Sequence, residues 1–418
     1  MKKLMQMVCL FLFCSVALPV FAEDEIRIGV IFPLTGPLAS TGQGLLEGVK
    51  LAAEVINTKN NLNMPLAKTE GLPNLKGAKI KIIAGDHQGK PEVGMAEAER
   101  LITQEKVVAI IGCYNSAVTA TASQAAERYG IPFLNDSSTS PSLTERGFKW
   151  FFRATPNDDL LSENFYHFLD DVKKKNKVAM GPIALLFENT LFGTDSRKFQ
   201  EKYAEKYGYK ISGVVSYPAK STQLTSEIQK LRTFNPSIVM QTSYTADAIL
   251  SMKTYKELNF TPSALLANNA GFNDPEFIKS LGKDADYILS REVWAKDLSA
   301  KKPMIKTVAD MFEKRAGKPM SGDYARSFTG MIILADAINR AKSIEPAKIQ
   351  QALLQTDIKP DQLIMPWDGV KFDPKTHQNV LGKGIIVQIL NGERYTVWPF
   401  SLATKEIVWP FPKWDQRK

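Results

Sequence analysis

Small hydroxyl-bearing residues follow two predicted strands of this chain, in loops that could hold a polar ligand. The first loop, Gly112-Cys113-Tyr114-Asn115-Ser116, follows a predicted strand over 107–111 and leads into a predicted helix that begins at Ala117. Ser116 is placed to cap that helix, and its hydroxyl and the first backbone N–H groups could hold a carboxylate. The second loop, Asn135-Asp136-Ser137-Ser138-Thr139-Ser140-Pro141, follows the next strand. A plain helix cap and a solvated turn are the alternative interpretations, but two such loops on neighbouring strands predict a pocket floor.

Residue types that perform catalysis are sparse. The histidines His87, His167 and His377 have no metal-ligand spacing on one element, so metal catalysis is not expected. Neither a Gly-x-Ser-x-Gly elbow nor a phosphate loop occurs. Cys113 could be a nucleophile, but no histidine is near it in sequence and a buried thiol is favoured. The glycines of 42–48 differ by one residue from the spacing of a dinucleotide-binding turn, which disfavours a dehydrogenase.

The composition excludes disordered and fibrous classes, with 44% hydrophobic and 23% charged residues in 418. This length allows two or three domains, each large enough to bury a core. The net charge of +9 is spread in short clusters such as Lys173-Lys174-Lys175, without interleaved aromatic residues. Such clusters indicate solvated helix ends, so no nucleic-acid partner is expected.

The first 22 residues have the pattern of a cleaved signal peptide. Lys2 and Lys3 precede an apolar run over 4–20, and small residues precede a predicted cleavage after Ala22. Lipidation at Cys14 is disfavoured because a bulky Phe13 precedes it. The mature chain is therefore expected in the periplasm, with Cys113 as its single cysteine and no intramolecular disulfide.

The elements that must position the two loops alternate between short β-branched runs and longer amphipathic segments. This alternation predicts an α/β fold with parallel sheets covered by helices on both faces. The strands are predicted at 26–32, 80–84, 107–111, 132–134, 151–153, 183–187, 211–216, 238–241, 264–267 and 287–289, with a strand-rich tail from Ile364. The helices are predicted at 44–56, 91–103, 117–128, 160–174, 194–207, 224–231, 246–258, 304–315, 325–341 and 346–354.

In order and spacing, several short motifs resemble the periplasmic solute-binding proteins of the leucine/isoleucine/valine-binding type, which serve ABC importers. They include Leu34-Thr35-Gly36-Pro37, Ile110-Ile111-Gly112, Ser137-Ser138-Thr139-Ser140-Pro141, Glu188-Asn189-Thr190-Leu191-Phe192-Gly193 and Trp367-Asp368-Gly369. The resemblance implies two doubly wound parallel-sheet lobes joined by three crossovers, the periplasmic binding protein type I fold. Lobe 1 is expected to comprise 23–154 and about 295–367, and lobe 2 to comprise 155–294 and about 384–418.

The resemblance also implies the ligand-binding residues, which line the cleft between the lobes. Ser116 and Thr139 are expected to contact the ligand through hydroxyl and N–H groups, and Ser137 through its carbonyl. Three aromatic residues are expected to form walls of the site: Tyr244, Phe192 and Tyr324. For Phe192 and Tyr324, ordinary packing is an equal alternative.

Two departures from the family pattern bear on the ligand. Thr41 stands where the family often places an aromatic residue over the ligand. The loop that carries an acidic residue in amino-acid binders has Asn268-Asn269 here, and Asn269 is the better match. A buried ammonium without a carboxylate is poorly compensated, which favours an amide, a urea-like solute or a carboxylic acid. Asp247 or Glu188 could replace the missing carboxylate, so amino acids remain open.

The function expected from the resemblance is capture of a small polar solute by hinge closure, followed by docking on the membrane permease of an ABC importer. No cofactor and no metal are expected, and the chain is expected to be a monomer. A ligand-sensing receptor module of the same fold is the alternative, and an exported enzyme is a distant one.

Overall fold

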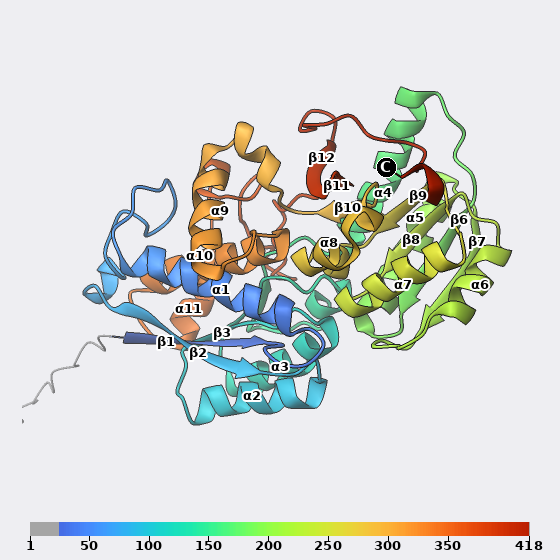
Figure 1. Ribbon diagram of the computed structural model, residues 1–418. Helices are drawn as coiled ribbons and strands as arrows, with labels where there is room; N and C mark the ends of the chain where they lie inside the picture. Colours follow the sequence, from blue (N-terminus) through green and yellow to red (C-terminus); the bar gives the residue numbers. More distant parts are fainter. Residues whose placement is uncertain (1–24, 418) are drawn as a thin grey trace, which may run out of the picture.

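The computed structural model describes residues 25–417, so the predicted signal peptide lies outside the described residues. Two sheets with helices on their faces dominate the fold (Figure 1). The first sheet has the order β2-β1-β3-β4-β5, and all its pairings are parallel. Its strands are β1 (Glu25–Phe32), β2 (Lys79–Asp86), β3 (Ala109–Gly112), β4 (Phe133–Asn135) and β5 (Phe151–Arg153).

The second sheet has the order β12-β11-β10-β9-β8-β6-β7 and is parallel from β7 to β10. Its strands are β6 (Ile183–Glu188), β7 (Ile211–Tyr217), β8 (Ile238–Thr242), β9 (Ala264–Ala267), β10 (Leu289–Glu292), β11 (Ile385–Leu390) and β12 (Glu393–Trp398). The prediction of two sheets of mainly parallel strands flanked by helices is confirmed.

The antiparallel β11–β12 hairpin is an addition within the predicted strand-rich tail. Its turn is Asn391-Gly392, where both residues have positive φ, +54° and +75°. That combination matches the twist of a two-residue hairpin. Residues 364–384 form isolated bridges rather than strands, so the predicted tail of strands begins only at Ile385.

Helices cover both faces of each sheet, as the alternation predicts. The helices packed around the first sheet are α1 (Ala39–Asn57), α2 (Pro91–Thr103), α3 (Ser116–Tyr129), α9 (Pro303–Ala316), α10 (Gly322–Ala341) and α11 (Pro346–Leu354). Those around the second sheet are α4 (Asp158–Asn176), α5 (Leu191–Tyr207), α6 (Thr225–Thr233), α7 (Thr245–Glu257) and α8 (Pro275–Leu281). One core lies between α1, α10 and the first sheet, a second lies under α2 and α3, and a third fills the second half.

Two boundary errors in the predictions have clear physical causes. Helix α1 begins at Ala39 rather than at Gly44, because tertiary packing overrides the poor helix propensity of its first turn. Strand β10 begins at Leu289 rather than at Tyr287, because Tyr287 has a positive φ of 74°. The polar residues Arg291 and Glu292 at the end of β10 are nevertheless buried.

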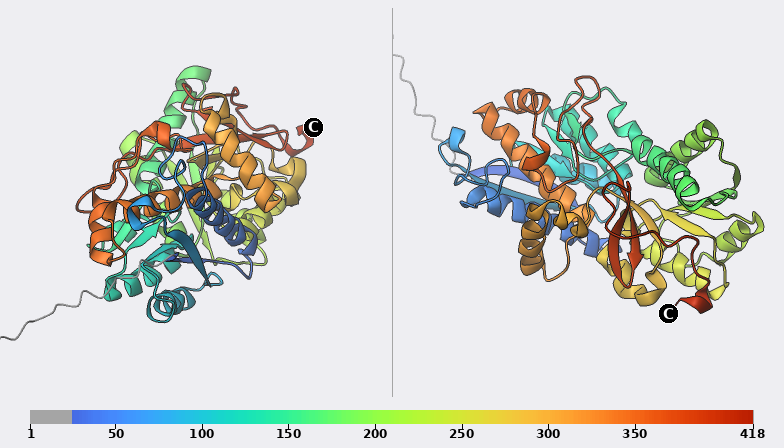
Figure 2. Two further views of the ribbon diagram at one scale, coloured as in Figure 1. Left: turned by 90° about the vertical axis from the view of Figure 1, so that its left-hand side faces the viewer. Right: turned by 90° about the horizontal axis from the view of Figure 1, so that it is seen from above.

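The chain passes between the two halves three times. It leaves β5 for α4, returns after β10 to α9 and α10, and crosses again from 377–379, which bridges β5, to β11. Figure 1 and the right-hand view of Figure 2 show the two halves side by side, with connecting segments between them. No helix among residues 25–417 is long and apolar enough to span a membrane.

Candidate functional site

A small pocket lies between the two halves, where the carboxyl ends of their parallel strands face each other, the usual ligand position of open α/β sheets. The structure brings six of the eight predicted site residues to its wall: Ser116, Ser137, Thr139, Phe192, Tyr244 and Asn269. The other lining residues are Tyr114, Ala270, Asp323 and Arg326.

Hydroxyl groups from the first half form the floor. Ser116 is the first residue of α3 and Asn115 is the N-cap, so the prediction that Ser116 caps this helix is wrong by one position. The Ser116 hydroxyl is buried and has no hydrogen-bond partner among the described residues. The Ser137 carbonyl accepts a 3.1 Å hydrogen bond from Arg326 Nη1, and the Thr139 carbonyl accepts one of 2.8 Å from the Asp158 amide.

Aromatic rings form the opposite wall. Tyr244 is the N-cap residue of α7, and its ring centroid lies 5.5 Å from that of Phe192 and 5.8 Å from that of Tyr114. Burial raises the pKa of Tyr244 and Tyr114 well above the usual value, so both phenols stay protonated. The Tyr114 hydroxyl has no partner among the described residues and is free to meet a ligand.

A buried charged pair completes the wall, and the sequence reasoning missed it. Asp323 and Arg326 lie in the first turns of α10, each at most 2% exposed, with 3.4 Å between Asp323 Oδ1 and Arg326 Nη2. Neither Asp323 oxygen has a hydrogen-bond partner within residues 25–417, and burial raises the pKa of this carboxyl group. The sequence does contain a signal that could have revealed this pair, namely two opposite charges three residues apart at the start of an apolar helix.

Thr41 and Tyr324 do not line this pocket. The Thr41 hydroxyl donates to Asp274 and lies 3.3 Å from the Thr245 hydroxyl, which ties α1 to the second half. The Tyr324 ring stacks on Phe312 with 5.3 Å between centroids and packs inside the first half.

Neither of the two carboxylates predicted as substitutes lies in the pocket wall. Glu188 accepts hydrogen bonds from the Thr190 and Gly193 amides, at 2.6 and 2.8 Å, and so holds the start of α5. Asp247 accepts one of 3.1 Å from the Lys220 amide. Asp323 is the carboxylate that the pocket contains.

The pocket is shut. Its volume is about 10 Å³, about the minimum that holds one water molecule. Hydrogen bonds join the two halves beside it, from Thr41 to Asp274 and from Ser142 to Asp195, the latter at 2.9 Å. A space of this size has no room for a solute unless the two halves move apart.

Cys113 is buried in the core under α2 and α3, as predicted, and burial raises the pKa of its thiol. The His87 ring does reach it, because Nε2 lies 2.9 Å from the Cys113 carbonyl oxygen. Burial lowers the pKa of His87 to about 4, so this ring is neutral at physiological pH. No cluster of metal-ligating side chains occurs among residues 25–417.

Comparison with known proteins gives consistent matches over most of the chain. The sequence profile of a family described as "Periplasmic binding protein" matches residues 25–393. The Leu/Ile/Val-binding protein homolog 7 of Brucella suis is 27% identical over 399 residues, which cover 93% of this chain and 95% of the relative.

Two solved structures share the fold. The leucine-binding protein LivK of Thermotoga maritima has a TM-score of 0.75 and 20% identity, with 89% of this chain and 97% of that chain covered. A solute-binding protein of an ABC transporter from Rhodopseudomonas palustris BisB5, in complex with 3,4-dihydroxybenzoic acid, has a TM-score of 0.74 and 19% identity, with 90% and 96% covered.

Proposed function

Because this chain belongs to the periplasmic binding protein family, we propose that it captures a small polar solute between two lobes and delivers it to the membrane permease of an ABC importer. One observation carries this proposal: buried polar atoms around the shut pocket, including Ser116 Oγ, Tyr114 Oη and both Asp323 oxygens, lack hydrogen-bond partners within residues 25–417. Buried polar groups are almost always satisfied, so these atoms are the ones a bound solute would pair.

The lobes in this proposal follow the sheets. Lobe 1 comprises 25–154 and about 295–367, and lobe 2 comprises 155–294 and about 384–417. The open form presents the lobe 1 loops to solvent, and closure brings Tyr244, Phe192 and Asn269 of lobe 2 onto the solute. Since the lobe 2 contacts exist only in the closed form, solute binding shifts the equilibrium toward it.

The solute carries both hydrogen-bond donors and acceptors in this proposal. Ser116 and Thr139 hold its acceptor group at the start of α3, as in the expectation from the family. Asp323 accepts from its amino or amide group and supplies the carboxylate that the Asn268-Asn269 loop lacks. This class includes amino acids, amides, urea-like solutes and carboxylic acids. Asp323 offers a partner for the ammonium group of an amino acid.

We further propose that the protein acts as a periplasmic monomer after cleavage behind Ala22, without a cofactor and without catalysing a reaction. The relatives named above are solute-binding proteins rather than enzymes. Their ABC-transporter context supports a permease as the partner.

The test is mass spectrometry of the solute released by denaturing protein purified from its own periplasm, paired with thermal shifts against amino acids, amides and carboxylic acids. A ligand that binds only the native form raises the melting temperature with its concentration. A Ser116→Leu variant serves as the control, because it fills the pocket floor. An identical thermal shift in wild type and Ser116→Leu would contradict the site.

A further inference from the structure

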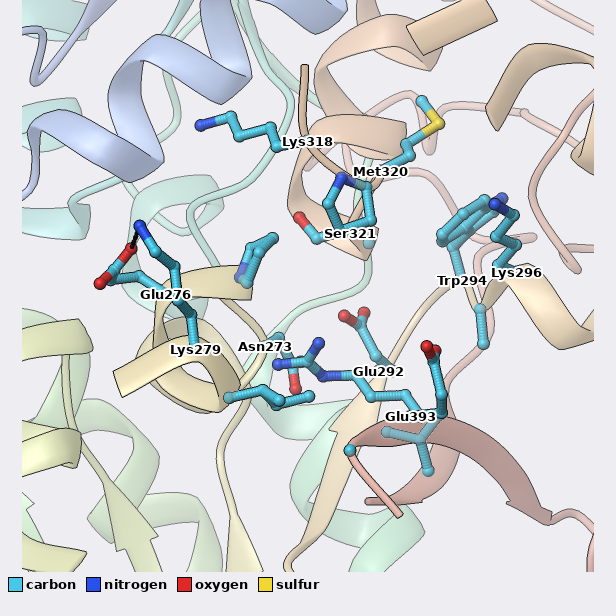
Figure 3. Close-up of a pocket in the computed structure, with 18 of the residues that line it drawn as sticks. Asn273, Glu276, Lys279, Glu292, Trp294, Lys296, Lys318, Met320, Ser321 and Glu393 are labelled. Atoms are coloured by element: carbon cyan, nitrogen blue, oxygen red, sulfur yellow. Dashed lines mark hydrogen bonds and ion pairs between the residues drawn. The ribbon is translucent and has the colours of Figure 1, made fainter. Parts of the chain in front are cut away.

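A second and much larger cavity lies on the other side of the start of α10. Its volume is about 550 Å³, within the range of small-molecule sites. The wall comes from the 317–322 loop of the first half, from α8 and the β11–β12 turn of the second half, and from the connection over 292–296 (Figure 3). An occupant would therefore touch both halves and the segment that joins them.

The basic side chains of this cavity are incompletely paired. The lining contains four basic and three acidic side chains. Lys279 pairs with Glu276 at 3.4 Å, and Lys296 pairs with Glu313 at 3.2 Å. The other two basic residues have no carboxylate within 4.0 Å among residues 25–417; they are Lys318 and Arg394.

Arg394 is held with hydrogen-bonding capacity to spare. Its Nη2 group donates to the Phe272 carbonyl at 2.9 Å and to the Asp274 carbonyl at 3.1 Å, which fixes the guanidinium plane. Its Nε and Nη1 groups have no hydrogen-bond partner in the described part of the chain. A fixed guanidinium with free N–H groups is suited to bind a carboxylate.

The acidic side chains of the lining have hydrogen-bond donors of their own or are exposed. Glu276 accepts from Lys279 and from the Ser280 hydroxyl, and Glu393 is exposed. The Glu292 carboxylate points into the cavity (Figure 3) and accepts a 2.7 Å hydrogen bond from the Val293 amide. Burial raises the pKa of Glu292, which favours its protonated form, and the protonated group can donate to a ligand oxygen.

We propose that this cavity is a second solute site, whose ligand carries a carboxylate held by Arg394 and Lys318. Lys318 Nζ donates at 2.8 Å to the Ser40 carbonyl and keeps other N–H groups for the ligand. An occupant here stabilises the closed arrangement, because Lys318 and Arg394 belong to different halves. The Glu292 carboxylate also lies 3.8 Å from Arg326 of the shut pocket, so the two sites share a wall. Since an occupant of either site favours the closed arrangement, binding at one site strengthens binding at the other.

The test follows the indole N–H signal of Trp294, which lines the cavity, by NMR of the full mature chain labelled with ¹⁵N-tryptophan. Trp294→Phe assigns the signal. Succinate is the probe, and succinamide is the uncharged control of similar size. We expect a saturable shift with succinate, with a dissociation constant of about 1 mM, and none with succinamide.

Two variants locate the ligand. Arg394→Gln is expected to weaken succinate binding about tenfold or more, because a charge-assisted contact is lost, and Lys318→Gln is expected to weaken it less. Ser116→Ala, which removes a hydroxyl from the shut pocket without adding bulk, should weaken binding there and leave the succinate shift in place, so failure of this proposal is distinguishable from failure of the first site. The proposal would be overturned if the folded Arg394→Gln and Lys318→Gln variants gave the same shift with succinate as wild type, or if wild type gave the same shift with succinamide. A shift that rises linearly with concentration and never saturates would also overturn it.

Discussion

The hydrogen bond between Thr41 and Asp274 should act as a latch that exists only when the lobes are closed. Thr41 lies in the first turn of α1 and Asp274 caps α8 on the other half, and both are buried. Thr41→Val keeps the side-chain shape and removes the hydroxyl. In the closed form of the variant, Asp274 Oδ2 loses its donor while Asp274 Oδ1 still accepts from the Glu276 amide at 2.8 Å.

The expected size follows from a buried hydrogen bond to a charged group, which contributes about 1.5–3 kcal/mol. A closed form destabilised by about 2 kcal/mol lowers the apparent affinity about 30-fold, because only the closed form completes the site. The loss should be seen in the dissociation rate, since the latch forms after encounter. Stopped-flow binding of the co-purified solute measures both rates.

Thr121→Val is the matched control. The Thr121 hydroxyl donates at 2.6 Å to the Pro91 carbonyl, and both residues lie in the first half. This change should lower stability without changing affinity. If Thr41→Val binds within about twofold of wild type, the latch does not contribute to closure and the reasoning is refuted.

Three further changes test the site and its surroundings. Ser116→Leu should abolish solute binding while the melting temperature stays near that of wild type, because the open form has room for the larger side chain and the lost hydroxyl has no hydrogen-bond partner within the described residues; calorimetric titration and a thermal scan check this. Tyr324→Phe should leave affinity unchanged and cost less than about 0.5 kcal/mol in denaturant unfolding, because its hydroxyl is likewise unpartnered there and its ring lies outside the pocket; a large loss of affinity would place Tyr324 in the site. Burial raises the pKa of Asp136 to about 7, so the folded state favours its protonated form, and its contribution to stability is full below the unfolded pKa and is lost as pH rises through about 7. Asp136→Asn should therefore flatten the fall in unfolding free energy between about pH 4 and 7, by at most about 4 kcal/mol; parallel pH profiles of wild type and variant would contradict the shift.

The sequence predicted the sheets well because their strands are apolar and buried on both faces, as at Ile238–Thr242. The positions of the two hydroxyl loops could also be predicted, because each loop directly follows one of these buried strands. It could not predict that Thr41 faces Asp274, because that contact joins residues 233 positions apart across the cleft. Asp323 was missed because only tertiary structure shows that the first turn of α10 points into the pocket.

Neither half of this protein is built from one continuous stretch of chain, unlike an ordinary domain. Strand β10 pairs with β11, where Leu289 lies opposite Gln388, and α10 covers one face of α1. In both cases the partner comes much later in the sequence. A growing polypeptide that has emerged only as far as Glu292 therefore has neither half finished. Such long sequence separations slow folding. A chain built this way remains without a complete core in either half until nearly all of it has been synthesised.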